Sequence, residues 1–388
     1  MNKRTETLIK DLIAEGYTIE ELKKTVIKTL EPFFTNKHSL ETYAFSAEIL
    51  STFSFLISYG KEDKFYSGLR QVLDIYNAAY ELYPDKVTEM MISILENSAQ
   101  KENQMWTVRE NVPDLKLDKD FYDKVISYMK HIGDSLEISV KYIIIELYAL
   151  LKLIEKDNIN YEHIQKISFG NAVQNILDLK KLQDVLIIPA TNLKVSDWRN
   201  IAYHHSYKVE KDLIICEYGK SKSIIQLTLT ELEKQMHYII RASNIFNIAR
   251  CIFAFDNIEA IHNSRIKHSN MNVVFRETLL LDNFKISILS QGFEMLDCKK
   301  DEKSVIAYLG DLKEINSFEE KQKRIIHSSQ LLFELWRTTK AEKLKIVYYD
   351  INKKLIAESS ISGSFFETNY CKEDFYSVFI KNVSFTIL

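Results

Sequence analysis

Apolar residues over the first 118 positions recur every three or four residues, which is the spacing of helices that bury one face. Thr18 and Glu21 stand three apart at the start of one such run and predict a helix-capping box. Pro84 and Pro113 mark breaks, because proline cannot continue a helix from within. The pattern predicts an irregular helical N-terminal domain over 1–118, with helices at about 19–30, 40–59, 63–82 and 86–104.

The next region, 119–265, predicts an antiparallel bundle of helices with short connections. Its first long helix has an apolar seam at spacings of three and four, formed by Leu136, Val140, Ile143, Leu147, Leu150 and Ile154. Asp134 and Glu137 stand in a second capping arrangement directly after Gly133. We therefore expect the seam helix to begin near Ser135.

Further helices and a pair of strands complete the bundle region. Serine and threonine at the start of an apolar run predict N-caps, and a glycine between two alternating runs predicts a turn. The expected elements are a helix at about 169–183, a shorter helix capped by Ser196, strands at 213–216 and 223–229 joined through Gly219, and the longest helix, about 231–260, capped by Thr230.

After His262 the pattern changes to alternation of apolar and polar residues, as in strands with one buried face. Asp350–Lys353 is a plausible hairpin turn. Ser317 and Glu320 predict the cap of one helix. Residues 266–388 are therefore expected to form a separate α+β domain with an antiparallel sheet. Its expected elements are strands at 284–288, 303–309, 344–349 and 354–359, and a helix at about 318–338.

Composition narrows the class of protein. Hydrophobic residues make up 46% of the 388 and charged residues 27%, as in soluble globular proteins. The chain has only 9 glycines and 4 prolines, the residues that most often interrupt helices and form turns. We therefore expect long helices to dominate. A net charge of −3 argues against a basic coat for bulk nucleic-acid binding but leaves room for a local basic groove. Since no apolar run approaches the roughly 20 residues of a membrane helix, and the charged N-terminus lacks a signal-peptide core, we expect a soluble cytoplasmic protein that contacts no membrane.

The four cysteines, Cys216, Cys251, Cys298 and Cys371, are scattered along the chain. Their spacing fits no zinc site, and such scattered cysteines are typical of a reducing compartment. No glycine-rich phosphate loop is present either. We therefore expect no metal and no other cofactor.

One stretch, 196–207, gathers side chains able to move protons or hold a phosphate: a guanidinium, an amide, two imidazoles and two phenols. Arg199 is followed at once by Asn200, and four residues separate Arg199 from His204. Asn200 and His204 share a helical face. Arg199 and His204 lie about 140° apart on an ideal helix, so they converge only through the reach of arginine, at a helix end or across a dimer.

This stretch resembles the HEPN family (higher-eukaryote and prokaryote nucleotide-binding domains). The family signature is an arginine, usually followed by a polar residue, and a histidine that is separated from the arginine by four to six residues. The resemblance covers roughly 120–265 and implies a HEPN-like antiparallel helical bundle within a mainly α protein. Many members are ribonucleases of toxin–antitoxin and phage-defence systems, and they commonly dimerise to form a composite site.

The chemistry of RNA fits these side chains. The 2′-hydroxyl attacks the adjacent phosphate when a base takes its proton and an acid protonates the leaving 5′-oxygen. Histidine suits both roles because its unperturbed pKa of about 6.5 lies near working pH. The guanidinium of Arg199 matches phosphate oxygens bidentately and suits the charge of the phosphorane. The expected reaction is metal-independent RNA cleavage, with Arg199, Asn200 and His204 as catalytic residues.

His205 is a rival of His204, because a gap of five residues is also allowed by the signature. His205-Ser206-Tyr207 also matches an ending of some toxin members in which the tyrosine is nucleotidylated by a partner antitoxin. Tyr203 and Tyr207 are candidate substrate-binding residues, although a structural role for Tyr207 is an open alternative. Glu146, on the polar side of the seam helix, is a candidate to orient Arg199, and a solvated glutamate is the favoured alternative.

Three hypotheses remain open at the level of the sequence. The first is an endoribonuclease acting in phage defence or as a toxin, with RNA as substrate. The second is a non-catalytic module that binds RNA or a nucleotide, and the third is a structural scaffold. The expected partners are a second copy of the chain, because one motif holds few acid–base groups, and an antitoxin or defence-system protein.

Overall fold

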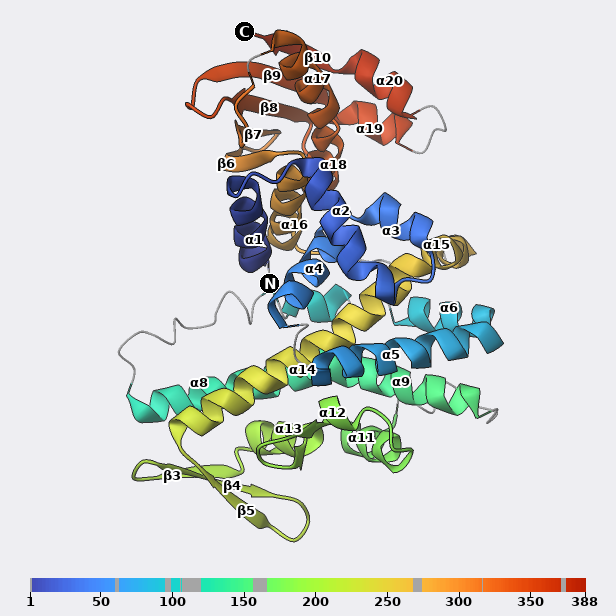
Figure 1. Ribbon diagram of the computed structural model, residues 1–388, viewed down its shortest axis with the longest axis vertical. Helices are drawn as coiled ribbons and strands as arrows, with labels where there is room; N and C mark the ends of the chain where they lie inside the picture. The colour runs from blue at the N-terminus through green and yellow to red at the C-terminus, as the bar shows by residue number, and fades with distance from the viewer. Residues whose placement is uncertain are drawn as a thin grey trace. The chain divides into compact units, whose positions relative to one another are not determined.

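The computed structural model describes residues 2–59, 63–94, 99–104, 106, 120–155, 166–267, 274–315, 317–370 and 375–388. These residues are mainly helical and carry three small sheets (Figure 1). The chain forms two compact units, the first from 1–30, 41–54 and 276–388 and the second from 31–40 and 55–275. Both units are assembled from separate stretches, whereas the sequence suggested three consecutive domains. The boundary expected at 118 and the break at Pro113 lie outside the described residues.

The second unit is organised around α14, Leu229–Asp256, which packs along α5, Asp63–Leu82, and α8, Phe121–Asp134 (Figure 1). Tyr76 of α5 stacks on Phe253 of α14, with ring centroids 4.9 Å apart. The other helices of this unit are η1 Glu31–Phe33, α6 Pro84–Ser93, α9 Lys141–Ile154, α11 Phe169–Asp178, α12 Gln183–Leu186, α13 Val195–Tyr203 and α15 Ile258–Lys267. Two more helices, α3 Lys37–Tyr43 and α4 Ala47–Tyr59, have residues in both units.

No new helix begins near Ser135, so the expected start of the seam helix is wrong. The chain runs from α8 through a π-helical segment, Ser135–Val140, directly into α9, and Asp134 has helical backbone angles and caps nothing. The amide of Lys141 donates to the carbonyl of Leu136 five residues back, which is the π-helical pattern. The expected apolar seam is confirmed in the core: Leu136, Val140, Ile143, Leu147 and Leu150 are at most 1% exposed.

Helix starts and ends differ from the sequence expectation in identifiable ways. The helix over 63–82 is confirmed, whereas the helix expected over 40–59 is broken between Tyr43 and Ala47. The cap of α14 is Thr228, because Glu231 closes a capping box with Thr228 rather than with Thr230. The expected caps at Thr18 and Ser317 are confirmed.

A three-stranded antiparallel sheet follows α13, in the order β3 (Tyr207–Glu210), β4 (Leu213–Tyr218) and β5 (Ser223–Leu227). Its second turn contains Gly219 with a φ of +70°, a conformation that glycine adopts without strain. A further two-stranded sheet pairs β1, Ile187–Ile188, with β2, Leu193–Lys194.

The first unit holds a five-stranded sheet in the order β10-β9-β8-β7-β6. Neighbouring strands are antiparallel except β7 and β8, which are parallel, so the sheet is mixed rather than antiparallel throughout. The expected hairpin through Asp350 is confirmed. The elements of this unit are α1 Asn2–Ala14, α2 Ile19–Leu30, α16 Glu277–Ser290, β6 Phe293–Lys300, β7 Ser304–Asp311, α17 Phe318–Ser328, α18 Leu331–Thr339, β8 Lys343–Tyr349, β9 Leu355–Ser362, α19 Gly363–Asn369, α20 Phe375–Asn382 and β10 Ser384–Ile387.

The strand expected at 284–288 is wrong, since these residues lie inside helix α16. Phe284 and Ile288, four apart, pack into the core beneath the sheet. Ile286 is also buried, at 1% exposed, and α16 packs against α1. A helix buried on several sides places apolar residues at odd and even positions alike, so a five-residue alternation does not distinguish it from a strand.

Candidate functional site

Helix α13 carries the predicted motif and is held in place by a buried tryptophan. Trp198 is fully buried, and its indole N–H donates to the hydroxyl of Thr191 at 3.3 Å. The helix begins one residue before the expected cap: Ser196 lies inside it and is buried, and the amide of Lys194 donates to the carboxylate of Asp197. With Trp198 facing inward, Arg199 is partly exposed and Asn200 is exposed.

The motif helix approaches α8 most closely at Gly133. A Cβ atom at this glycine would lie 3.0 Å from the ring of Tyr203 and 3.3 Å from the Cβ of Ala202. The absence of a side chain at Gly133, together with the small Ala202, lets the two helices pack at this distance. Tyr203 consequently lies over the last turn of α8, and 41% of the surface of this residue is exposed.

Arg199 is oriented by three neighbours. Its Nε donates to Glu137 at 2.8 Å, and its Nη1 donates to the side-chain oxygen of Asn200 at 3.1 Å. Its guanidinium carbon lies 5.3 Å from the centre of the Tyr203 ring, within range of a cation–π contact. Glu137 also accepts from Lys141 at 2.6 Å, so one carboxylate joins two cations. The fork of Arg199 is therefore fixed at the surface, and among the residues that the structure describes no hydrogen bond engages its Nη2.

The electrostatics of this cluster favour a charged carboxylate. Burial alone would raise the pKa of Glu137, but hydrogen bonds and charges from Lys141 and Arg199 outweigh it and lower that pKa. One turn earlier, burial raises the pKa of Asp134. Burial, together with the negative charges of Asp134 and Glu137, also raises the pKa of Tyr203, so its phenol keeps its proton. The site thus offers fixed positive charge from Arg199 and Lys141 beside a neutral aromatic ring.

Both candidate histidines lie at the end of α13 and are exposed. His204 is the C-cap, and its amide donates to the carbonyl of Asn200 at 2.9 Å. His205 has a φ of +51°, a left-handed conformation that histidine adopts less readily than glycine, and its ring centre lies 6.1 Å from that of Tyr207. Within the described residues no hydrogen bond joins either imidazole to Arg199. One copy of the motif therefore gathers Arg199, Asn200 and Tyr203, with the imidazoles at the adjacent helix end.

Tyr207 begins strand β3 and is partly buried. Burial and the neighbouring Tyr122 and Cys216 raise the pKa of its phenol. Because Tyr207 pairs with Cys216 in the sheet, it contributes to the packing of the strands.

Glu146 does not orient Arg199. It is fully buried and accepts instead from Nε of Arg250 on α14 at 3.0 Å. Burial raises the pKa of Glu146, while its attraction to Arg250 counteracts that rise. Both sequence-based readings of Glu146, as a residue that orients Arg199 and as a solvated glutamate, are wrong, and Glu137 was read as part of a helix cap. The spacing of Glu137 and Lys141, four residues apart on one side of a helix, indicates their own ion pair but gives no signal for the contact with Arg199.

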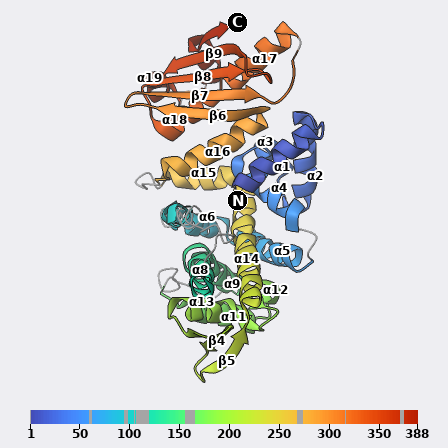
Figure 2. The same cartoon turned by 90° about the vertical axis from the view of Figure 1, so that its left-hand side faces the viewer.

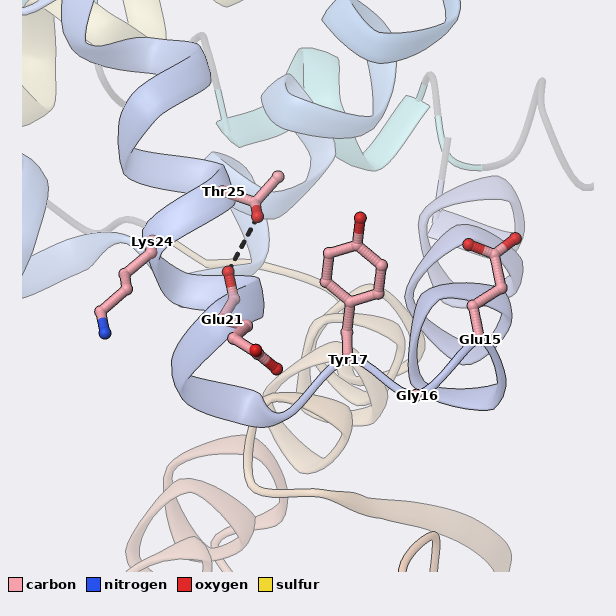
Figure 3. Close-up of a pocket in the computed structure, with 6 residues that line it drawn as sticks. All are labelled: Glu15, Gly16, Tyr17, Glu21, Lys24 and Thr25. Atoms are coloured by element: carbon pink, nitrogen blue, oxygen red, sulfur yellow. Dashed lines mark hydrogen bonds between the residues drawn. The ribbon is translucent and has the colours of Figure 1, made fainter.

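No group of three or more metal-ligating side chains occurs among the residues that the structure describes. A shallow hollow on the first unit, between α1 and α2, is lined by Glu15, Gly16, Tyr17, Glu21, Lys24 and Thr25 (Figure 3). With two carboxylates and one ammonium group, this hollow lacks the excess of positive charge that a phosphate requires. The cluster around Arg199 therefore remains the candidate site.

Compared with known protein families, curated proteins and solved structures, the chain has no match. No helix in the described ranges has both the length and the apolar character needed to cross a membrane.

Proposed function

We propose that the protein is a metal-independent endoribonuclease that acts in phage defence or as a toxin. The observation that carries this proposal is the fixed guanidinium of Arg199, held by Glu137 and Asn200, immediately before a helix end with two exposed imidazoles. A fixed cation and side chains that accept and donate protons are what cleavage by the 2′-hydroxyl of RNA requires. The HEPN-like character of the bundle is part of the proposal.

In this mechanism Nη2 of Arg199 faces the phosphate and stabilises the charge that develops on the phosphorane. His204 transfers the proton, either from the 2′-hydroxyl or to the leaving 5′-oxygen. Tyr203 offers its ring to a base beside the scissile phosphate. Glu137 acts as a positioning residue, because it touches Arg199 and not the reacting atoms.

A complete acid–base pair calls for a second copy of the chain. One copy supplies a single cluster at Arg199 with adjacent imidazoles, and a two-fold interface at the end of α13 would bring two clusters together. We propose a homodimer with a composite site, and an antitoxin or another defence protein as its regulator. Sedimentation should show about twice the 45.5 kDa of one chain, and a fully active monomer would contradict the composite site.

The test of the proposal is cleavage of a labelled single-stranded RNA in EDTA. We expect products with 2′,3′-cyclic phosphate ends and no cleavage of DNA of the same sequence, because DNA lacks the 2′-hydroxyl. The Arg199→Ala variant should be inactive. His237→Ala is the matched control, since His237 is an exposed histidine of α14 outside the site. Strict dependence on magnesium with 3′-hydroxyl products would overturn the mechanism.

A second candidate is a non-catalytic module that binds an RNA end or nucleotide at the same cluster. It is favoured by one observation: the ion pair with Glu137 already balances much of the charge of Arg199. This candidate predicts that the purified dimer binds RNA with an affinity that depends on Arg199 and yet leaves the RNA intact after prolonged incubation.

A further inference from the structure

Lys141 shares the carboxylate that holds Arg199. Its ammonium nitrogen lies 2.6 Å from Oε1 of Glu137, while Nε of Arg199 donates to Oε2 of the same carboxylate at 2.8 Å. The two cations come from different helices: Lys141 is the first residue of α9, and Arg199 lies on α13, which packs against α8 and the π-helical segment (Figure 1 and Figure 2). One carboxylate therefore fixes two cations beside each other.

The proposed mechanism uses only one of these cations. A lysine ammonium group has three N–H donors, and among the described residues only Glu137 accepts from Lys141. The side chain of Lys141 is 34% exposed, against 21% for Glu137. The ammonium group is thus less covered than its carboxylate partner, and it has donors left for a ligand that arrives from solvent.

Positive charge is in slight excess around this pair. The charged side chains of 130–141 and 194–199 are four cations, Lys130, Lys141, Lys194 and Arg199, and three carboxylates, Asp134, Glu137 and Asp197. Burial raises the pKa of Asp134, and the charge of Lys130 counteracts that rise. Asp197 accepts from the backbone amide of Lys194. Among the described residues Glu137 alone forms an ion pair with Arg199 and Lys141, so one positive charge of this pair is not balanced.

Two cations held in this way suit two neighbouring phosphates of one strand. Arg199 and Lys141 bind different oxygens of Glu137, so two hydrogen bonds and one carboxylate separate their charges. Consecutive phosphates of a single strand follow each other at a comparable step. A rigid guanidinium fork suits the phosphate at which charge develops, whereas an ammonium group on a flexible stem suits a phosphate that is only held.

We propose that Lys141 binds the phosphate next to the scissile one in a single strand of RNA. The inference rests on the proposed function, because it assumes that Arg199 contacts the scissile phosphate. Glu137 then spaces two subsites by fixing one cation for each. The neighbouring phosphate on the 5′ side and the one on the 3′ side offer the same chemistry to the ammonium group, and the test below covers both.

The test compares two ligands that cannot be cleaved, a dinucleotide and a trinucleotide of adenine, both fully 2′-O-methylated. The first has one phosphodiester and the second has two, and neither has a free 2′-hydroxyl, so the full-length wild type is used. Binding is measured by calorimetry at low salt. In the wild type the second phosphate should tighten binding roughly tenfold, as expected for one charge-assisted hydrogen bond. Lys141→Gln should lose this gain, whereas Arg199→Ala should weaken the binding of both ligands.

Three controls isolate the phosphate and the lysine. A trinucleotide with a neutral methylphosphonate at either linkage keeps the third base but should bind like the dinucleotide. Lys141→Arg should retain the gain, since arginine also carries a charge that binds phosphate. Lys152→Gln is the matched control, because Lys152 lies on the same helix, is 28% exposed and also pairs with a glutamate. Thermal unfolding of each variant verifies that it is folded.

Salt dependence provides an independent readout. In the wild type, the slope of log affinity against log salt should be steeper for the trinucleotide than for the dinucleotide by about 0.7, the value for one phosphate contact of a single strand. In Lys141→Gln the two ligands should have the same slope.

The outcomes separate the subsite from the ribonuclease. An equal gain in the wild type and in folded Lys141→Gln would overturn the subsite, even if the wild type cleaves RNA. A loss in Lys141→Gln that is the same for both ligands would also overturn it, because the lysine would then act only by holding Glu137 and Arg199. A wild type that binds neither ligand refutes the subsite as well. A gain that depends on Lys141, in a protein that never cleaves RNA, would support the subsite and refute the ribonuclease.

Discussion

Glu137 and Arg199 lie 62 positions apart in the sequence, and their side chains meet at 2.8 Å between helix α13 and the π-helical segment before α9. The contact defines which corner of the guanidinium remains for a ligand, because Nε and Nη1 are both engaged. It also couples the candidate site to the helix that carries the apolar seam of the second unit.

The two histidines should differ in their effect on cleavage. General acid–base groups contribute typically 10²–10⁴-fold, so His204→Ala should reduce the single-turnover rate by about that factor. His205 has a left-handed backbone, so His205→Asn is the appropriate variant, because asparagine tolerates this conformation. We expect a loss of about tenfold or less for His205→Asn. A dead His205 variant beside an active His204 variant would reverse the assignment.

Glu137 should stabilise the fold in a pH-dependent manner. Its pKa is lowered in the folded state by Lys141 and Arg199, against the effect of burial. A lowered folded-state pKa adds stability above the unfolded value of roughly 4.3, and this stability is lost as the pH falls through the folded-state value. Glu137→Gln should therefore lower the free energy of unfolding at pH 7 by about 1 kcal/mol or less, since the pair is partly exposed.

Urea unfolding of the wild type and of Glu137→Gln at pH 7 and at about pH 3 measures this difference. The two proteins should differ at pH 7 and converge at the lower pH. A difference that grows on acidification would contradict the assigned ion pairs. On cleavage, Glu137→Gln should cost less than Glu137→Ala, because the amide oxygen of glutamine still accepts from Nε of Arg199.

Gly133→Ala should affect the site more than the fold. The added methyl group would lie 3.0 Å from the partly exposed Tyr203 ring, which is able to move away, and 3.3 Å from the Cβ of Ala202, which moves only with its helix. Alanine favours the helix by roughly 1 kcal/mol over glycine, which offsets part of this crowding. We expect a small change in melting temperature and a clear loss of cleavage, because the displaced ring no longer lies beneath Arg199. Loss of stability without loss of activity would show that the Tyr203 contact is structural.

Replacing Glu146 in its buried pair with Arg250 should lower the free energy of unfolding without a direct effect on the candidate site. Glu146→Ala leaves the cation of Arg250 without its partner in the core, and removing one member of such a pair costs about 3–5 kcal/mol. Urea unfolding should show this loss. A variant with wild-type stability would mean that Arg250 reaches solvent when Glu146 is removed.

The sequence was informative where a periodicity or a cap has one physical meaning. The seam from Leu136 to Leu150, the capping box at Thr18 and the hairpin at Asp350 are all present. It failed where local patterns were ambiguous. The spacing of Asp134 and Glu137 equally suits a helix cap and the inside of a continuous helix, and only the partner on α13 distinguishes them.

The candidate site shows the same limit. Arg199, Asn200 and Tyr203 are found together from their spacing on one helix, since neighbouring turns place such residues within reach. Glu137 and Lys141 come from another part of the chain, and a single sequence contains no signal for a contact across 62 positions. The roles of His204 and His205 remain predictions.

The π-helical segment Ser135–Val140 amounts to one residue inserted into an otherwise regular helix. Each helical residue turns the chain by about 100°, so a single deletion in this segment would rotate everything before it against everything after it. The apolar seam could then keep its place in the core only if Glu137 turned away from Arg199. A one-residue change in length, made without altering any side chain that touches a ligand, would therefore disconnect the guanidinium from its carboxylate.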